Sequence, residues 1–99
     1  LSTTKSGSSE TTPVITAPAS GDWVVSYWTA KSSVVTAWTA GAGQTVRSAD
    51  NGSGSGRVNS LLTDGGGPVS AGSVGGVTAT TDQPFSVATA WTIVLSPAT

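Results

Sequence analysis

The sequence predicts an all-β protein, an antiparallel β-sandwich of the jelly-roll or immunoglobulin-like kind. Thr-Ala-Trp-Thr at positions 36–39 returns at 89–92, and both copies lie in runs of β-branched and aromatic residues, which favour strands. About six or seven such runs are separated by turn-forming clusters of Gly, Pro, Asn and Asp, as expected of a sandwich. No run has the 3.6-residue apolar period or the capping box of a helix, so we expect essentially no helix.

The first residues are the least patterned. Residues 1–11 are mostly Ser, Thr and Gly and predict a linker or an edge segment, whereas residues 12–97 are expected to form the sandwich domain. Residues 12–17 have Pro13 near their start and are followed by Pro18. Because proline cannot donate to a strand ladder, this segment predicts a short edge strand that covers a sheet margin.

Residues 22–29 predict the best strand of the chain. They are apolar on both faces, which is typical of a central strand that is covered on both sides. The polar break at 30–33 is followed by a second alternating run at 34–39, so we expect a hairpin. Trp28 and Trp38 would then lie near one another across it.

The middle of the chain alternates between strands and loops. Residues 44–48 predict a short strand, and the Gly- and Ser-rich residues 50–56 predict a loop without regular structure. Residues 57–63 predict a further strand. Its two faces would carry Val58, Ser60 and Leu62 on one side and Asn59 and Leu61 on the other.

Two strands are expected near the C-terminus. Residues 77–81 predict a short Thr-rich strand, and residues 85–95 a long one that ends before Pro97. Alternation in the long strand predicts one face made of Val87, Thr89, Trp91, Ile93 and Leu95.

The four tryptophans decide which surfaces are buried. Trp23, Trp38 and Trp91 alternate with Val, Ala and Ile and are expected in the core, where truncation of Trp91 to Ala would cost about 3–5 kcal/mol. Trp28 stands at the end of its run beside a polar turn and is the best candidate for exposure. With Tyr27 it forms a candidate surface contact, of the aromatic kind that stacks on sugar rings.

Composition excludes several functions. Charged residues make up 9% of the chain, far below the roughly 25% of ordinary domains, and the net charge is −1, so we expect no nucleic-acid partner. The chain has no stretch of 18 apolar residues, so no membrane insertion is expected. Cysteine is absent, Ser and Thr supply about a third of the residues, and such a hydroxyl-rich surface suggests an extracellular protein.

The sequence offers no catalytic, cofactor or metal site. Histidine and cysteine are both absent, which excludes the usual catalytic triads and zinc sites. Most of the acidic residues stand beside Gly, Asn or Pro, where a carboxylate usually accepts backbone N–H groups in a turn. We therefore expect no enzyme, unless two aspartates share a cleft. The acidic residues are Glu10, Asp22, Asp50, Asp64 and Asp82.

Two further features allow alternatives. Asp50 and Asn51 open a flexible loop and are candidate surface contacts; calcium is a conceivable ligand, but the acidic spacing of a dedicated calcium loop is lacking. Lys5 or Lys31 could form an isopeptide bond with Asn51 or Asn59, a crosslink known from cysteine-free surface adhesins.

From Thr11 onward the chain resembles a β-sandwich module that recurs in secreted actinobacterial proteins and in phage virion proteins of the same hosts. The resemblance implies an exported structural or adhesive module without catalytic residues. In that family these strings form the second half of a longer jelly-roll-like domain, which implies that strands from an upstream segment or another chain complete the sheets. The strings are Thr11 to Pro13, Trp23 to Trp28 with Lys31 to Ser33, Thr36 to Thr39, Gly54 to Arg57 leading into Leu61 and Leu62, Ala79 to Asp82, and Trp91 to Leu95.

The function expected from the sequence is that of a non-catalytic extracellular β-sandwich, a structural or adhesive module of a cell-surface or virion assembly. Its partners would be other protein chains, in a homo-oligomer or a larger assembly. The alternative is a carbohydrate-binding module of a secreted hydrolase, with glycans as the ligand.

Overall fold

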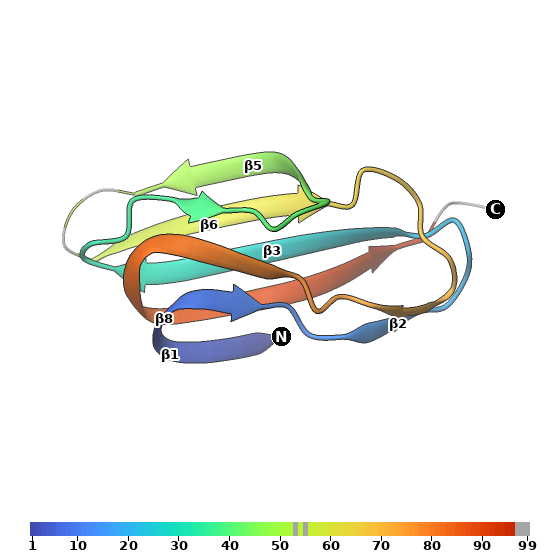
Figure 1. Cartoon of the computed structure of the whole chain (residues 1–99), viewed down its shortest axis with the longest axis horizontal. Helices are drawn as coiled ribbons and strands as arrows, with labels where there is room; N and C mark the ends of the chain where they lie inside the picture. Colours follow the sequence, from blue (N-terminus) through green and yellow to red (C-terminus); the bar gives the residue numbers. More distant parts are fainter. Residues whose placement is uncertain (53, 55, 97–99) are drawn as a thin grey trace.

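The computed structural model describes residues 1–52, 54 and 56–96. Within these residues the chain contains eight strands and no helix, and its antiparallel sheets pack against each other (Figure 1). The predicted all-β sandwich is therefore confirmed. The predicted stop at Pro97 lies outside the described residues.

Five strands form the main sheet, in the order β1-β8-β3-β6-β5, with every neighbouring pair antiparallel. β4 also pairs with β8, and β2 and β7 form a separate two-stranded sheet. The strands are β1 (Ser2–Thr11), β2 (Ile15–Ala17), β3 (Trp23–Ser32), β4 (Trp38–Thr39), β5 (Thr45–Asn51), β6 (Arg57–Asp64), β7 (Gly72–Val74) and β8 (Thr78–Leu95).

Two strands pass from one layer of the sandwich to the other. The later part of β8 pairs with β3 and with the start of β1, whereas residues 78–80 pair with the end of β1. β1 turns at Ser6, which has a positive φ of 54°, and its register shifts between Gly7 and Ser9. Figure 1 shows both strands curling over at the same end of the molecule. The end of β1, the start of β8 and β4 form a layer that faces the main sheet.

The predicted terminal elements differ in length from the observed ones. Residues 1–11 were predicted to form either a linker or an edge segment. They form the edge strand β1 almost throughout. The two strands expected at 77–81 and 85–95 are one bent strand, β8. The bend lies around Pro84, whose carbonyl accepts a hydrogen bond from Ser32 Oγ at 3.2 Å.

The core lies between the two layers. Trp28 of β3 contacts Trp38 of β4, with ring centroids 6.4 Å apart, and Trp38 contacts Phe85 at 6.2 Å. Both indole N–H groups donate to backbone carbonyls, Trp28 to Glu10 at 3.0 Å and Trp38 to Asn59 at 3.1 Å. The large rings therefore fill the core without an unpaired N–H group. The remaining members of the core are small or aliphatic: Ala30, Val35, Leu61, Ala79, Ala88 and Ala90.

The hairpin expected between 22–29 and 34–39 is wrong. The neighbours of β3 are β6 and β8, and β4 pairs with β8 in the opposite layer. The segment after β3 crosses between the layers because Ser32 Oγ accepts the N–H groups of Val34 and Val35 at 3.0 and 3.1 Å. Trp28 and Trp38 are neighbours as expected, but they meet across the core.

The grouping of residues on β6 follows the prediction, whereas the face of β8 that was expected in the core points outward. Asn59 and Leu61 of β6 are buried and Val58 is exposed, an assignment that the alternation alone did not make. In β8 the small side chains of Ala88 and Ala90 point into the core, and the residues expected there point outward. Alanine fits at these positions because bulky rings from the other strands already occupy the space.

The loop expected at 50–56 begins later than predicted. Asp50 and Asn51 are the last residues of β5, where they pair with Ser60 and Asn59 of β6. Ser53 and Ser55 lie outside the described residues. The candidate contacts Asp50 and Asn51 therefore stand on a strand at the edge of the main sheet.

Candidate functional site

The side of the main sheet that faces away from the core is the candidate site, and we call it the outer face. Residues directly opposite each other on neighbouring strands point to the same side, so register identifies which side chains form one row. Its β1, β3, β6 and β8 residues are Thr3, Lys5, Trp23, Val25, Tyr27, Thr29, Lys31, Val58, Ser60, Leu62, Asp64, Val87, Thr89, Trp91, Ile93 and Leu95.

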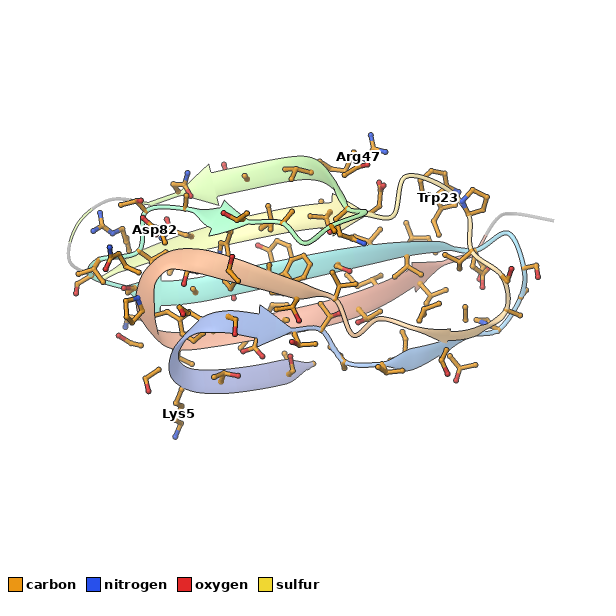
Figure 2. All side chains as sticks on the ribbon, viewed as in Figure 1. Lys5, Trp23, Arg47 and Asp82 are labelled. Atoms are coloured by element: carbon orange, nitrogen blue, oxygen red, sulfur yellow. The ribbon has the colours of Figure 1, made fainter. Side chains whose placement is uncertain are left out.

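One end of the outer face is apolar. Trp23 is opposite Leu95, and Val25 is opposite Ile93. The exposed fraction is 36% for Trp23, 42% for Ile93 and 53% for Leu95. Figure 2 labels Trp23 at the end of the molecule near the start of β3. We call these four residues the apolar end.

An aromatic pair lies next along the same two strands. Tyr27 of β3 is opposite Trp91 of β8, and their ring centroids are 5.5 Å apart at an interplanar angle of 42°. Both side chains are partly exposed. This aromatic pair thus lies on an open surface, where ring edges and faces remain available to a ligand.

Hydroxyl groups form the following row. Thr29 of β3 is opposite Thr89 of β8, with a 2.7 Å hydrogen bond between their Oγ1 atoms. Thr3 continues this row on β1, and Ser60 continues it on β6. Asp50 of β5 is opposite Ser60 and completes the row at the far edge.

Two lysines form the last row. Lys5 of β1 and Lys31 of β3 are both opposite Val87 of β8, so they flank it on the same face. Two strand spacings separate them, about 10 Å. Both lysines are exposed, and Figure 2 shows Lys5 pointing away from the ribbon.

A shallow groove lies between the hydroxyl and lysine rows. Its cavity volume is about 130 Å³, and Thr29, Thr89 and Lys31 contribute its polar lining. The rest of the lining comes from β3, β6 and β8, through Ala30, Val58, Val87 and Ala88. The rows from Tyr27 to Lys31, together with this groove, are here called the polar end.

The prediction that Trp28 is an exposed surface contact is wrong. Its side chain is fully buried, because the even-numbered residues of β3 face the core. Tyr27 does lie on the outer face. Trp91 and Trp23 were expected in the core, but Trp91 is on the outer face and Trp23 is exposed at its apolar end. The expected core position of Trp38 is confirmed.

Asp50 and Asn51, the candidate contacts at the end of β5, point to opposite sides of the main sheet. Asp50 shares a row with Ser60 on the outer face, whereas Asn51 is opposite the inward-facing Asn59. Asn59 is fully buried, and its amide accepts from Gly52 N at 3.0 Å and donates to the Val35 carbonyl at 2.8 Å. Lys31 points to the other side of the sheet, so the isopeptide crosslink between Lys31 and Asn59 has no suitable geometry.

Two aspartates are engaged in local structure. Asp64 accepts from Arg47 Nε at 2.7 Å and from Gly66 N at 2.7 Å, and the hydrogen bond from Arg47 is the main reason that the pKa of Asp64 lies below its usual value. Asp82 accepts from the hydroxyl and the N–H group of Thr36 and from Ala37 N. These bonds, first that of the Thr36 hydroxyl, lower the pKa of Asp82.

The other buried acids also serve local structure. Glu10 accepts from the hydroxyls of Ser2 and Thr4 at 3.2 and 3.0 Å, which joins the two arms of β1. Asp22 accepts from Ala19 N at 3.3 Å. No group of three potential metal ligands occurs among the described residues. Glu10 and Asp22 therefore accept hydrogen bonds from hydroxyl and backbone groups of the fold.

A second cavity of about 200 Å³ opens between the main sheet and the β2–β7 sheet. Gln44 is its one amide, and this amide already accepts a hydrogen bond from Thr63 at 2.7 Å. The remaining lining is Val24, Gly65, Val69, Val74, Gly75 and Val77. This cavity has no nucleophile, acid or base with which to act on a ligand.

Within residues 1–52, 54 and 56–96 no helix is long and apolar enough to cross a membrane. In comparisons with known proteins, no family model, no curated protein and no solved structure matches the chain.

Proposed function

We propose that the chain is a non-catalytic extracellular β-sandwich module, a structural or adhesive part of a surface or virion assembly. It binds a second copy of the chain through the apolar end of the outer face. The observation that carries the proposal is the exposure of Trp23, Ile93 and Leu95 side by side on one open sheet face. Exposed apolar groups that are contiguous mark interaction sites, because covering them removes apolar area from water at about 25 cal/mol per Å².

Composition supports the extracellular part of the proposal. The chain has no cysteine, only 9% charged residues and many hydroxyl groups. Glu10, Asp22, Asp64 and Asp82 accept hydrogen bonds within the fold, which supports a role in contact without chemistry.

Sedimentation of the isolated chain tests the contact. We expect the average mass to rise with concentration, and Ile93→Lys to abolish this rise because a charge cannot be buried cheaply in an apolar contact. The matched control is Val34→Lys, which alters an exposed valine in the segment after β3. A folded monomer at every concentration would contradict self-association.

Carbohydrate binding, as in a module of a secreted hydrolase, is the second candidate. The partly exposed Tyr27–Trp91 pair favours it, since sugar rings pack on aromatic faces. Soluble glycans should then quench tryptophan fluorescence, and Trp91→Ala should remove the quenching. Quenching that persists in this variant would place the ligand elsewhere.

A further inference from the structure

We propose that the polar end of the outer face binds an acidic glycan. Tyr27 and Trp91 contact a sugar ring, and Lys5 and Lys31 bind the carboxylate or sulfate groups of the chain. This inference rests on the second candidate function and names its ligand class. It leaves the apolar end free to bind another copy of the protein.

The spacing of the rows fits an elongated ligand. Tyr27 and Lys31 are four residues apart on β3, which corresponds to about 13 Å along the strand. Thr29 lies between them on the same face, and its row is opposite Thr89. A linear sugar chain laid along β3 and β8 would therefore meet aromatic rings, then hydroxyls, then cations.

The hydroxyl row retains hydrogen-bonding capacity. Thr29 and Thr89 use one donor between them in their 2.7 Å bond. Each hydroxyl has one donor and two acceptor positions, so this pair still offers one donor and further acceptors. Sugar hydroxyls require both kinds of partner. The row can therefore bind a sugar without breaking its own hydrogen bond.

The distribution of charge favours an anionic ligand. The chain carries four cationic side chains. Arg47 is bound to Asp64 at 2.7 Å, and Arg57 donates to the Ser33 carbonyl at 2.6 Å. Lys5 and Lys31 instead share one row of the outer face, although the net charge of the chain is −1.

Neither acid of the outer face stands in the lysine row. Asp64 is held by Arg47, and Asp50 stands on β5 in the neighbouring hydroxyl row, two strands from Lys31 and at the opposite edge of the sheet from Lys5. Two cations about 10 Å apart, at about one Debye length in 0.1 M salt, attract an anion jointly. The groove beside Lys31 holds about 130 Å³, room for a carboxylate or sulfate group.

A nucleic acid is the other polymer that combines rings and negative charge. Proteins that bind single strands use a positively charged groove that follows the backbone over many phosphates. Here the cationic surface is limited to two lysines at one end of the face. The hydroxyl row between the aromatic pair and the lysines suits the many hydroxyl groups of a sugar chain, so the geometry favours an acidic sugar polymer.

Affinity electrophoresis tests the inference with native gels that contain polygalacturonate, dextran or a single-stranded oligonucleotide. We expect polygalacturonate to retard the wild-type chain at least about tenfold more strongly than dextran, because two exposed ion pairs each contribute a few-fold. Lys5→Gln combined with Lys31→Gln should remove this preference, as should added salt. Trp91→Ala should weaken retardation by both sugars.

Arg47→Gln is the matched control, since it removes one positive charge from a half-exposed side chain. Asp64, its partner, lies six residues from Val58 along β6, about 20 Å from the lysine row. We expect polygalacturonate to retard the Arg47→Gln variant within about twofold of the wild type, because the charge that it removes is exposed and remote from the lysine row. A cooperative unfolding transition in guanidinium shows that each variant is folded.

Each other outcome has a defined meaning. Equal retardation by polygalacturonate and dextran, lost in Trp91→Ala, would overturn the acidic preference and leave carbohydrate binding intact. No retardation by either sugar would overturn both. Retardation by the oligonucleotide that depends on Lys5 and Lys31 would assign the site to nucleic acid. If Arg47→Gln lowered the retardation as much as the lysine substitutions do, the preference for polygalacturonate would reflect the net charge of the protein, and the proposed site would be overturned.

Discussion

Trp28 donates its indole N–H to the backbone carbonyl of Glu10 at 3.0 Å, in the middle of the protein. The bond joins the central strand β3 to the second arm of the edge strand β1, which belongs to the opposite layer. One side chain therefore fills the core and also connects its two walls.

This dual role predicts unequal costs for two tryptophan truncations. Trp28→Ala should lower the free energy of unfolding by about 3–5 kcal/mol, because it leaves a cavity and an unpaired carbonyl. Trp91→Ala should cost only roughly 1–2 kcal/mol, since its partly exposed ring loses less apolar burial. The sequence predicted a loss of about 3–5 kcal/mol in the free energy of unfolding for Trp91→Ala, but the structure indicates this loss for Trp28→Ala instead. Guanidinium unfolding measures both, and equal costs would contradict the assignment of faces.

The buried amide of Asn59 predicts a second contrast. Asn59→Ala should destabilise the protein by about 1–3 kcal/mol, since the Val35 carbonyl loses its partner and Gly52 N loses one acceptor. Asn51→Ala, its exposed neighbour across the strand pair, should stay within about 0.5 kcal/mol of the wild type. Urea denaturation compares the two. A cost for Asn51→Ala that matches that of Asn59→Ala would show that edge pairing matters more than the buried amide.

Asp82 predicts an acid-dependent stability. Its pKa in the folded protein lies below the ordinary value of 3.8, chiefly because of the Thr36 hydroxyl. A depressed folded-state pKa stabilises the protein fully above the unfolded value, and this contribution disappears as pH falls through the folded-state pKa. Thermal unfolding from pH 7 to pH 2 should show the loss below about pH 4. Asp82→Asn should have a flatter profile, and an unchanged profile in this variant would exclude Asp82 as a cause.

Gly75 predicts a backbone effect at the second sheet. Its φ is +98°, and a Cβ atom there would approach the Pro13 carbonyl oxygen to 2.1 Å. Gly75→Ala should therefore cost at least about 2 kcal/mol, since it adds a clash to a left-handed conformation. Gly43→Ala is the control: φ is +79°, but the space around it is open, so about 1 kcal/mol is expected. Equal melting temperatures for the two variants would contradict the contact with Pro13.

Local pattern explains what the sequence could predict. Alternation identified strands and excluded helices, and in β6 it grouped Asn59 with Leu61 on one face. It did not show which face is buried, because Leu61 and Leu62 are equally apolar and lie on opposite faces. Turn-forming residues marked most breaks between strands. These features depend on neighbours in the chain, which a sequence displays directly.

The candidate site depends on features that local pattern does not encode. Both residue sets of β8 are apolar, so hydrophobicity did not show that Ala88 and Ala90 face inward while Trp91 faces outward. The pairing of Lys5 with Val87 joins residues from the two ends of the chain. The alternation of small and large residues in β8 could have indicated the inward face, because the core rings of β3 and β4 leave room only for small side chains such as Ala88 and Ala90.

The pairing of β1 with β8 determines when this protein can fold. Ser2 to Lys5 have their strand partners at 87–90, so during synthesis these residues cannot complete their ladder until residues 87–90 have left the ribosome. Closing so long a loop is costly before any contact offsets it, and folding should therefore be slow and follow translation. Until then the core tryptophans remain accessible, and a chaperone that shields them would raise the yield of native protein.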